Sequence, residues 1–454
     1  MSTTAPQNLQ ALFKAYDVRG LVPEQLDEDL AESIGNAFVA VTGAGAIVVG
    51  HDMRPSSPGL ATAFARGATR AGADVTAIGL CSTDGLYFAS GRLDMPGVMF
   101  TASHNPAQYN GIKMCRAGAA PIGMETGLAD IRDRVASGED LVAEAPGSVA
   151  EDDLLDDYAD YLLELAPVRG RRLRVVVDAG NGMAGLTAPA VLGRIDADVT
   201  AMFYELDGTF PNHEANPIDP ANLVDLQAKV REVGADIGLA FDGDADRCFL
   251  VDERGDLVSP SVLTALIAAR ELAKEPGARI IHNLITSRAV PEIVREHGGE
   301  PVRTRVGHSF IKQTMAQTGA VFGGEHSGHF YFRDFWRADS GMLAALHALA
   351  ALAEFDGPLS RLLAPYTRHA ASGEINSEVA DQEAIVAAIE SEFSRADDVE
   401  LDRLDGLTVT HPDWWFNVRA SNTEPLLRLN AEGKDEQTMV AIRDRVLSRI
   451  RSNR

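Results

Sequence analysis

The sequence has 454 residues, of which 45 % are hydrophobic and 24 % charged, which is typical of a soluble globular protein with several domains. Its formal net charge of −25 excludes general binding to nucleic acid or to an anionic membrane surface, because both need a basic face on the protein. The three cysteines, Cys81, Cys115 and Cys248, are too few and too scattered for a disulfide framework or a zinc site.

The N-terminal third of the chain predicts alternating strands and helices. A strand or turn is predicted at 14–20, helices at 26–41 and 58–71, and strands at 46–49, 74–78 and 97–100. Apolar residues run continuously through these strands, as they do in parallel or mixed sheets that helices cover. An acidic segment at 139–160 then predicts a solvated linker and the start of a helix.

Two further blocks repeat the succession of an apolar strand, a polar loop and a helix. Strands are predicted at 174–178, 236–241, 278–282, 302–304, 320–322 and 330–332, and helices at 261–274 and 309–318. We therefore expect an internal structural repeat, although the blocks share no clear sequence similarity. The most apolar helical stretch, 342–355, is too short to cross a bilayer, and the N-terminus lacks the pattern of a secretion signal, so we expect a cytoplasmic protein.

The C-terminal part of the chain changes in character after residue 358. Short strands are predicted at 374–379, 407–410, 414–418 and 426–430, with helices at 382–393 and 436–449. Successive strands without alternating helices are typical of a small α+β domain. We thus expect three α/β domains, at 1–145, 146–252 and 253–365, and an α+β domain at 366–454.

A polar loop of unusual composition follows the predicted strand at 97–100. It reads Thr101-Ala-Ser-His-Asn-Pro106 and presents the hydroxyl of Ser103 beside the imidazole of His104, with the ammonium of Lys113 downstream. Pro106 removes a backbone donor and disfavours helix at the preceding residue. A hydroxyl held at such a turn suits a nucleophile or a phosphate carrier, although an ordinary serine-rich turn has the same composition.

A second loop, Asp242-Gly-Asp-Ala-Asp-Arg247, directly follows the predicted strand at 236–241. Asp242, Asp244 and Asp246 stand at alternate positions of a tight turn, from which their carboxylates can converge on one hard cation such as Mg²⁺. A solvated acidic loop is the weaker interpretation, because three adjacent acids repel one another unless a cation balances them. The segment also resembles the nucleophile loop of haloacid-dehalogenase-type phosphatases, in which Asp242 would be phosphorylated.

A third loop, Gly323-Gly-Glu-His-Ser-Gly-His329, lies between two apolar strands. Its glycines allow close approach of a ligand, and Glu325, Ser327 and His329 can bond to sugar hydroxyls. A metal site built on His326 and His329 is the competing interpretation, but no third ligand is visible nearby in the sequence.

A fourth loop, Arg419-Ala-Ser-Asn-Thr-Glu-Pro425, offers guanidinium, hydroxyl, amide and backbone donors, which is the chemistry of a phosphate cradle. A simple turn would use the same residues. Elsewhere, Gly180-Asn-Gly-Met-Ala-Gly185 fits the G-x-G-x-x-G pattern of dinucleotide sites. This pattern is weak by itself and Asn181 is a common turn residue, so we expect a turn there rather than NAD binding.

Taken in order, these loops resemble those of the α-D-phosphohexomutase family, and the resemblance spans essentially the whole chain. The segments that carry it are Ala15-Tyr-Asp-Val-Arg-Gly20, Thr101 to Pro106 with Tyr109-Asn-Gly-Ile-Lys113, Asp242 to Arg247, Gly324 to His329, and Arg419 to Pro425. Any one could arise by chance, but four specific loops in family order are hard to explain otherwise. The resemblance implies three similar α/β domains with mixed sheets around a central cleft, and a smaller C-terminal α+β domain related to the TATA-binding-protein fold.

The resemblance also implies a role for each loop. Ser103 would be the phosphoserine that donates and recovers a phosphoryl group, and together with Asp242, Asp244 and Asp246 it would hold Mg²⁺. The sugar hydroxyls would be bound by Glu325 and Ser327, and the non-transferring phosphate by Arg419, Ser421, Asn422 and Thr423. The positions that face the reacting phosphate or the sugar in relatives are Tyr16, Arg19, Lys113, Arg247, His308 and His329.

The implied activity is interconversion of mannose 1-phosphate and mannose 6-phosphate, with glucose phosphates as further substrates, through a hexose 1,6-bisphosphate that also serves as activator. Two phosphoryl transfers need a general base and acid, for which His104, Lys113 and His329 are candidates that the sequence leaves open. The expected partners are small hexose phosphates, without nucleic acid or membrane, in a monomer or small homo-oligomer. A haloacid-dehalogenase-type sugar phosphatase and a non-catalytic sugar-phosphate binding protein are the alternatives.

The sugar loop bears on specificity within the resembled family. Gly-Glu-His-Ser-Gly-His is similar to the phosphomannomutase and dual mannose/glucose branch, whereas Gln at position 326 would indicate a phosphoglucosamine mutase and a second Glu there a glucose-only enzyme. His326 replaces the Met of some dual enzymes, which leaves dual specificity open. Because the bisphosphate must reorient, we expect hinge motion of the C-terminal domain near residues 355–367.

Overall fold

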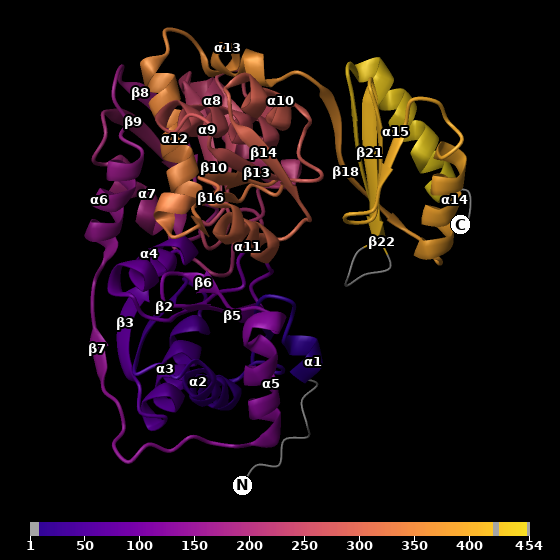
Figure 1. Ribbon diagram of the computed structural model, residues 1–454. Coiled ribbons are helices and arrows are strands. Elements are labelled where there is room, and N and C mark those ends of the chain that lie inside the picture. The colour runs from indigo at the N-terminus through magenta and orange to yellow at the C-terminus, as the bar shows by residue number, and fades with distance from the viewer. Residues whose placement is uncertain (1–8, 421–425, 452–454) are drawn as a thin grey trace.

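The computed structural model describes residues 9–420 and 426–451. Their strands form four sheets, one for each of four domains. Figure 1 shows the first domain at the bottom, the second and third together above it, and the C-terminal domain at their side.

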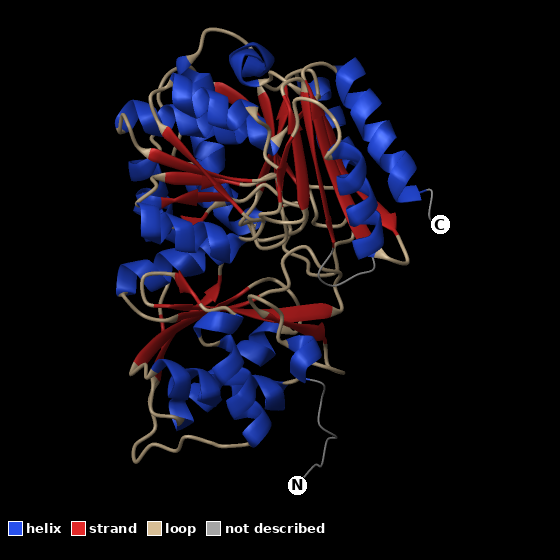
Figure 2. Ribbon diagram, turned by 45° about the vertical axis from the view of Figure 1, so that its right-hand side comes forward, coloured by secondary structure: helices blue, strands red, loops and turns tan. Residues whose placement is uncertain are grey.

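The first domain is built on a sheet in the order β1-β5-β4-β2-β3-β7, with β6 paired to β5. Its strands are β1 (Val18–Leu21), β2 (Ala46–His51), β3 (Asp74–Leu80), β4 (Gly97–Phe100), β5 (Tyr109–Arg116), β6 (Ala120–Pro121) and β7 (Val149–Glu151). Its helices are α1 (Leu9–Leu12), α2 (Glu28–Thr42), α3 (Ser57–Arg70), α4 (Thr83–Leu93), the 3₁₀-helix η1 (Met124–Thr126) and α5 (Leu128–Ser137). Figure 1 shows helices α2 and α3 together on one side of this sheet, and Figure 2 shows from another side that helices lie below its strands.

The second and third domains each contain a five-stranded mixed sheet with helices around it. The second comprises α6 (Leu155–Leu165), β8 (Leu173–Asp178), α7 (Ala184–Leu192), β9 (Ala197–Met202), η2 (Pro220–Leu223), α8 (Val224–Val233), β10 (Ile237–Phe241), β11 (Cys248–Asp252) and β12 (Leu257–Val258). The third comprises α9 (Pro260–Lys274), β13 (Arg279–Asn283), α10 (Ala289–Glu296), β14 (Glu300–Thr304), α11 (His308–Thr318), β15 (Phe322–Gly324), β16 (Phe330–Phe332), η3 (Arg333–Phe335), β17 (Ala338–Asp339), α12 (Gly341–Glu354), α13 (Leu359–Leu363) and η4 (Ala364–Tyr366).

The C-terminal domain is a five-stranded antiparallel sheet in the order β18-β22-β21-β20-β19, and Figure 1 shows its two helices together on one face. Its elements are β18 (Ala370–Glu378), α14 (Gln382–Phe393), β19 (Glu400–Asp402), β20 (Leu407–His411), β21 (Trp414–Ala420), β22 (Leu426–Gly433) and α15 (Glu436–Arg451). This confirms the expectation of a smaller α+β domain at the C-terminus.

Three of the sheets share one topology. In each, a strand (β2, β8 or β13) pairs in parallel with two neighbours, and one of these neighbours forms an antiparallel hairpin with the strand that follows it. The hairpins are β4–β5, β10–β11 and β15–β16. The internal repeat is therefore confirmed. The three hairpin loops are equivalent in topology, and they carry Ser103, the three aspartates and Glu325.

The cores show which domains are separate units. The C-terminal domain has a core of its own, and most apolar residues of the first domain form another. One continuous core runs through the second and third domains and includes Tyr87, Phe88 and Cys115 of the first. Helix α12 is buried from Gly341 to Ala353, as expected for a helix that is apolar on all sides. Among the described residues no single helix has the length and apolar character to span a membrane. Helix α12 reaches that length and apolar character only when residues 359–366 are added, and the chain bends by 103° between the two segments.

The acidic segment at 139–160 contains a strand that its sequence does not suggest. β7 extends the first sheet by pairing in parallel with β3, with Val75 opposite Val149. All three residues of β7 are exposed, so the sequence has no hydrophobic pattern that predicts this strand. The strand forms through backbone hydrogen bonds at the edge of the sheet. The first sheet therefore includes residues beyond the boundary expected at 145. The sequence patterns also fail to single out β5, whose apolar residues alternate irregularly with Asn110, Gly111 and Lys113.

Candidate active site

Ser103 lies in the β4–β5 loop and faces the loop of the second domain. Its hydroxyl donates a hydrogen bond to Asp242 Oδ2 at 2.7 Å, and its backbone N–H donates to Thr101 Oγ1 at 2.9 Å. The residue has a φ of 49°, a left-handed conformation that non-glycine residues seldom adopt and that is frequent at functional sites. The side chain is thus turned away from the first domain and towards the aspartate loop.

A buried arginine that the sequence did not single out shapes this loop. Arg54 is fully buried and donates to four backbone carbonyls, those of Ser103, Asn105, Pro106 and Tyr109, at 2.7–2.9 Å. Its Nε lies 3.2 Å from Asp52 Oδ2, so its charge is balanced. One guanidinium therefore holds the backbone on both sides of the serine. Its carbonyl partners are about fifty residues away along the chain, which no local pattern can reveal.

The aspartate loop is packed directly against Ser103. A Cβ at Gly243 would lie 2.4 Å from the carbonyl oxygen of Ser103, so only glycine allows the two loops this approach. Asp242, Asp244 and Asp246 are all buried, and none of the three residues is more than 2 % exposed. Burial of this kind demands compensating cations or hydrogen bonds.

Cationic side chains from two domains supply part of that compensation. Lys113 Nζ donates to Asp244 Oδ2 at 2.6 Å and to Asp246 Oδ2 at 2.7 Å, while Arg247 Nε donates to Asp242 Oδ2 at 2.9 Å. Burial, with the neighbouring aspartate charges, raises the pKa of Asp242 to about 8 against the effect of Arg247. Burial alone would also raise the pKa of Asp244, but Lys113 holds it well below its usual value.

The aspartate cluster fits a small divalent cation. One carboxylate oxygen from each of Asp242, Asp244 and Asp246 lies within 4.8 Å of the others. Asp244 Oδ1 and Asp246 Oδ1 are buried and have no hydrogen-bond partner. Carboxylate oxygens are the ligands that Mg²⁺ prefers, and a buried oxygen without a hydrogen-bond partner is otherwise costly.

Arg19 and His104 complete the surroundings of the serine. Arg19 donates to the side chains of Asp17 and Asn105, and to the carbonyl of Ala102 at 3.2 Å. His104 Nδ1 lies 3.3 Å from Ser103 Oγ, and burial, together with the charges of Arg247 and Arg19, lowers the pKa of His104 to about 2. The imidazole is therefore neutral at physiological pH and a weak base.

The sugar loop joins the same centre from the third domain. Arg247 and His329 form an isolated antiparallel bridge, which attaches the β15–β16 loop to the aspartate loop. Glu325 is buried and accepts hydrogen bonds from Tyr331 at 2.7 Å, from the N–H of Gly307 at 3.2 Å and from Asn283 at 3.3 Å. The hydroxyl of Ser327 lies 2.9 Å from His329 Nδ1.

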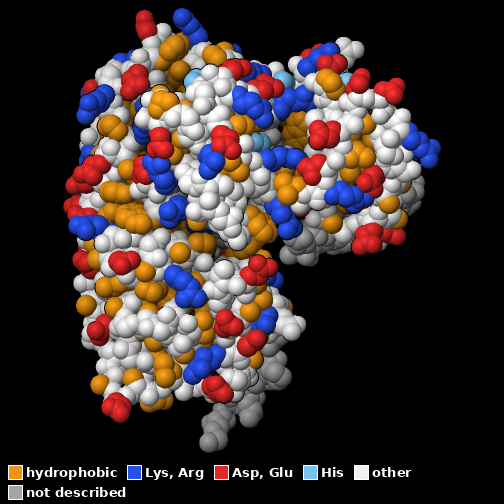
Figure 3. Space-filling model, viewed as in Figure 1, with side chains coloured by type: hydrophobic (Ala, Val, Ile, Leu, Met, Phe, Trp, Pro, Cys, Tyr) orange, Lys and Arg blue, Asp and Glu red, His pale blue; other side chains and the backbone are white. Residues whose placement is uncertain are grey.

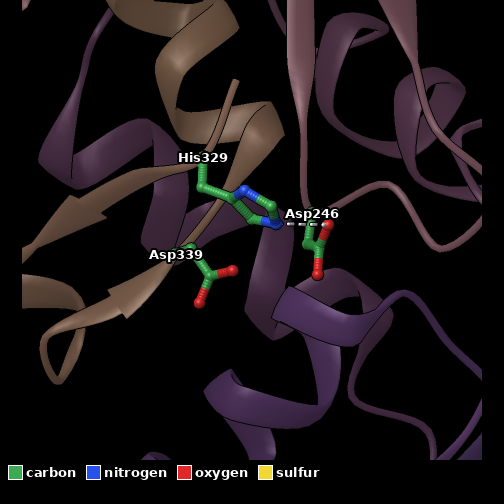
Figure 4. Close-up of side chains that lie close together, drawn as sticks. All are labelled: Asp246, His329 and Asp339. Carbon is green, nitrogen blue, oxygen red and sulfur yellow. Dashed lines mark ion pairs between the residues drawn. The ribbon is translucent and has the colours of Figure 1, made fainter. Parts of the chain in front are cut away.

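His329 is directed at the aspartate loop rather than at His326. Figure 4 shows its ring pointing to Asp246, whose Oδ1 lies 3.7 Å from His329 Nε2, with the carboxylate of Asp339 beside them. His329, Asp246 and Asp339 could together hold a cation, but Lys312 already lies 2.7 Å from Asp339. Among the described residues, the group of potential metal ligands that includes His329 does not include His326, so the structure does not support a metal site shared by these two histidines.

Only the first two residues of the predicted phosphate loop, Arg419 and Ala420, are among the described residues. Ser421, Asn422 and Thr423 lie outside the described residues. Arg419 donates to Glu374 at 2.9 Å and stands opposite Arg428 across the β21–β22 pair, so the two guanidinium groups share a face and the carboxylate of Glu374. Figure 3 shows further Lys and Arg side chains along the junction of this domain with the rest of the molecule, despite the negative net charge.

The remaining sequence candidates lie in two places. Tyr16 is close to the segment that precedes His308, because a Cβ at Gly307 would lie 2.9 Å from the Tyr16 hydroxyl, and His308 begins α11.

In the G-x-G-x-x-G segment, Asn181 has a φ of 59° and a Cβ at Gly185 would lie 2.2 Å from a carbonyl oxygen. Turn geometry and close packing thus account for these residues without a dinucleotide.

Two further residues support the centre without any signal in the sequence. Thr83, at the start of α4, donates from its hydroxyl to Asp244 Oδ2 at 2.6 Å and from its N–H to the carbonyl of Asp244 at 3.0 Å. The adjacent Asp84 accepts from Tyr158 at 2.8 Å and from Ser340 at 2.6 Å, which joins the first three domains at one carboxylate. These partners lie 74 to 256 residues apart in sequence.

Family models match the chain in all four domains. The phosphoglucomutase/phosphomannomutase alpha/beta/alpha domains I, II and III match residues 10–141, 156–255 and 260–369, and the C-terminal domain of the same family matches residues 374–449.

Similar proteins extend over nearly the whole chain. A protein of Xanthomonas campestris described as "Phosphohexose mutases" is 41 % identical over 443 residues, which are 96 % of this chain and 98 % of that one. A phosphomannomutase of Escherichia coli K12 is 40 % identical over 446 residues, 96 % and 97 % of the two chains. A phosphomannomutase/phosphoglucomutase of Pseudomonas putida is 36 % identical over 441 residues, 96 % and 94 % of the two chains.

A solved structure agrees with the sequence comparison. A phosphoglucomutase/phosphomannomutase family protein from Burkholderia thailandensis has a TM-score of 0.89 and 35 % identity, and the match covers 98 % of both chains. With four matching domains in order and relatives at this identity, the chain belongs to the phosphoglucomutase/phosphomannomutase family of enzymes.

Proposed function

We propose that this chain is a phosphohexomutase that interconverts mannose 1-phosphate and mannose 6-phosphate, and also the corresponding glucose phosphates. The names of its relatives support this activity. The observation that carries the mechanism is the 2.7 Å hydrogen bond between the hydroxyl of Ser103 and Asp242, because it joins a candidate phosphate carrier to a cluster of carboxylates that fits a cation.

In the proposed cycle, phosphorylated Ser103 meets the free hydroxyl of a bound hexose phosphate. The bond between phosphorus and the serine oxygen breaks as the sugar oxygen bonds to phosphorus, and the hydroxyl proton passes to a base. The leaving oxygen of Ser103 takes up a proton from an acid, for which the Lys113 ammonium is a candidate. The product is a hexose 1,6-bisphosphate, which reorients and returns its other phosphate to Ser103. Such a transfer depends mainly on positioning and on neutralisation of charge.

The residues around Ser103 suit these two tasks. Asp242, Asp244 and Asp246 would hold Mg²⁺ together with the serine phosphate, and the bound ion would supply charge neutralisation at the phosphoryl oxygens. Arg247 and Arg19 add fixed positive charge next to the same point. A phosphoserine carries about −1.5 to −2 charges near neutral pH, so these cations would keep it ordered.

We propose His329 as the general base that takes the sugar proton. Burial would lower the pKa of Lys113, but Asp244 and Asp246 hold it above its usual value, so its ammonium is a proton donor or a fixed charge. His104 is a weak base because its pKa is lowered to about 2 by burial and nearby arginines. His329 remains, with Nε2 facing Asp246 and Nδ1 beside the hydroxyl of Ser327.

The substrate would lie between the third and C-terminal domains. Glu325 and Ser327 would bind the hydroxyls of the ring, Tyr16 and His308 would lie beside them, and Arg419 with Ser421, Asn422 and Thr423 would hold the phosphate that is not transferred. Since mannose and glucose differ at one hydroxyl, a pocket that binds the hydroxyls they share accepts both.

A coupled assay with mannose 1-phosphate and glucose 1-phosphate, in the presence of glucose 1,6-bisphosphate and Mg²⁺, tests the proposal. We expect Ser103→Ala to lose at least about a thousand-fold in kcat, because the covalent route is removed. Ser33→Ala, which removes a hydroxyl on α2 that donates to the carbonyl of Asp29, is the control and should keep wild-type activity. Full activity in Ser103→Ala would contradict the mechanism.

Two other outcomes would identify the alternatives. Release of inorganic phosphate, with the covalent phosphate on Asp242, would indicate a phosphatase of the haloacid-dehalogenase type. Binding of hexose phosphates without any conversion, even with the bisphosphate activator, would indicate a sugar-phosphate binding protein. The family membership of the chain favours the mutase over both.

A further inference from the structure

One short segment lies between the C-terminal domain and the sugar-binding carboxylate. Val306 and Gly307 precede α11, and their two successive N–H groups donate in different directions. The N–H of Val306 donates to Asp405 Oδ2 of the C-terminal domain at 3.1 Å, and the N–H of Gly307 donates to Glu325 Oε1 at 3.2 Å. Two consecutive peptide units thus contact the C-terminal domain on one side and the proposed sugar ligand Glu325 on the other.

Asp405 is firmly attached to the strand that leads to the phosphate loop. It lies in the turn between β19 and β20, and its carbonyl accepts a hydrogen bond from the amide of Asn417 at 2.9 Å. Asn417 is fully buried in β21, the strand that carries Arg419. A displacement of β21 would therefore be passed to the carboxylate of Asp405 and from there to Val306.

Gly307 lies at a position that only glycine can occupy. Its φ of 130° is available only to glycine, and a Cβ there would lie 2.9 Å from the hydroxyl of Tyr16. Its N–H is directed at Glu325, which is buried and also bonded to Asn283 and Tyr331. Movement of Val306 therefore changes how the carboxylate of Glu325 is held.

We propose that Asp405 is a positioning residue that couples docking of the C-terminal domain to the orientation of Glu325. When the C-terminal domain docks, it brings the phosphate loop to the substrate. The same movement places Asp405 against Val306, and this contact aligns Gly307 and Glu325 for the sugar hydroxyls. The inference rests on the proposed function. It adds a residue outside the four loops and explains how a sugar contact can depend on closure of a separate domain.

The interface offers a matched control. Asp402 lies on β19 and pairs with Arg303 of the third domain, so it also joins the two domains, whereas the acceptor of the Val306 N–H is Asp405. Asp402→Asn weakens the contact between the two domains but leaves the hydrogen bonds of Val306 and Gly307 in place. Asp405→Ala removes the acceptor of the Val306 N–H, and Asp405→Asn restores a neutral acceptor at the same position.

Steady-state kinetics with inorganic phosphate as a competitive inhibitor separates positioning from general damage. For Asp405→Ala we expect KM for mannose 1-phosphate to rise about ten-fold, while the Ki of inorganic phosphate, which needs only the phosphate loop, changes less than about two-fold. Asp405→Asn should recover part of the loss, and Asp402→Asn should change neither constant by more than about two-fold. The double variant Asp405→Ala/Glu325→Gln should be no worse than Glu325→Gln, because both act on one contact.

Amide hydrogen exchange of the free protein provides a readout that needs no activity. Peptides covering 305–308 and 323–329 should exchange faster in Asp405→Ala than in Asp402→Asn or the wild type. Equal exchange in the three proteins, or equal rises in KM and Ki, would overturn the proposal. If the wild-type protein shows no mutase activity, the proposed function fails, whereas the exchange measurement still decides whether Asp405 holds this segment.

Discussion

At the scale of single residues, the centre depends on charges that face one another across loops of different domains. Ser103 bonds to Asp242, Lys113 to Asp244 and Asp246, and Arg247 to Asp242. The aspartates and the lysine could be predicted from the sequence because their loops are short and chemically unusual. Arg54 could not, because its partners are carbonyl groups, which every residue has.

Arg54→Lys tests the role of this arginine. A lysine cannot reach four carbonyls, so the loop of Ser103 should lose its support. We expect mutase activity to fall at least about ten-fold and the protein to lose about 3–5 kcal/mol of stability, as when other buried charged contacts are broken. Arg66→Lys, whose side chain is half exposed and pairs with Glu32, is the control and should cost less than about 1 kcal/mol. Activity and melting temperature are measured on the same samples.

Wild-type activity in Arg54→Lys, or equal losses in both variants, would show that the loop holds its conformation without the guanidinium.

At the scale of secondary-structure elements, the function is carried by equivalent hairpin loops. The β4–β5, β10–β11 and β15–β16 loops supply the carrier, the cation ligands and the sugar ligands in turn. Sequence patterns predicted most strands and helices and the repeat itself, because continuous apolar strands mark a covered sheet. They did not predict β7, which forms through backbone hydrogen bonds at an edge and has only exposed residues.

Gly243→Ala tests the contact between the first two of these loops. The new Cβ would lie 2.4 Å from the carbonyl oxygen of Ser103, which Arg54 holds in place, so one loop must move away. We expect kcat to fall at least about ten-fold while the melting temperature changes little, because the strain is confined to the loops. Gly45→Ala has no atom within 4 Å of its new Cβ and should leave activity unchanged. Equal activity of the two variants would contradict the close approach of the loops.

At the scale of the whole molecule, three domains meet at Asp84, whereas the fourth has a core of its own and contacts the third through Asp402, Asp405 and Trp415. The separate core is consistent with our proposal that the C-terminal domain moves about a hinge near residues 355–367, while the first three domains keep the centre assembled. The sequence predicted four domains but not how they are joined, because Asp84, Tyr158 and Ser340 are ordinary residues whose partners are distant in the chain.

Asp84→Asn tests the three-domain junction through its pH dependence. Burial raises the pKa of Asp84 to about 6 in spite of its hydrogen bonds to Ser340, Ser82 and Tyr158. The folded protein therefore binds the proton more tightly than the unfolded chain, and the stability this contributes is present below the unfolded pKa and lost as pH rises through about 6. Wild-type stability should fall by about 1 kcal/mol between about pH 5 and pH 7.5 relative to Asp84→Asn.

Melting temperatures of both proteins across this range give the comparison, with Asp130→Asn, an exposed carboxylate of α5, as control. A difference between Asp84→Asn and the wild type that does not change with pH would show that Asp84 is ionised throughout and that its pKa is not raised.

The most direct test of the mechanism is to locate the covalent phosphate. The protein is incubated with glucose 1,6-bisphosphate and Mg²⁺, quenched, digested and examined by tandem mass spectrometry, with Ser103→Ala treated in parallel. Our account predicts one phosphorylated site, Ser103 in the peptide that contains Thr101 to Pro106, and no phosphate in the variant. A phosphate on Asp242 or on any other residue, or turnover without any phosphorylated protein, would contradict it.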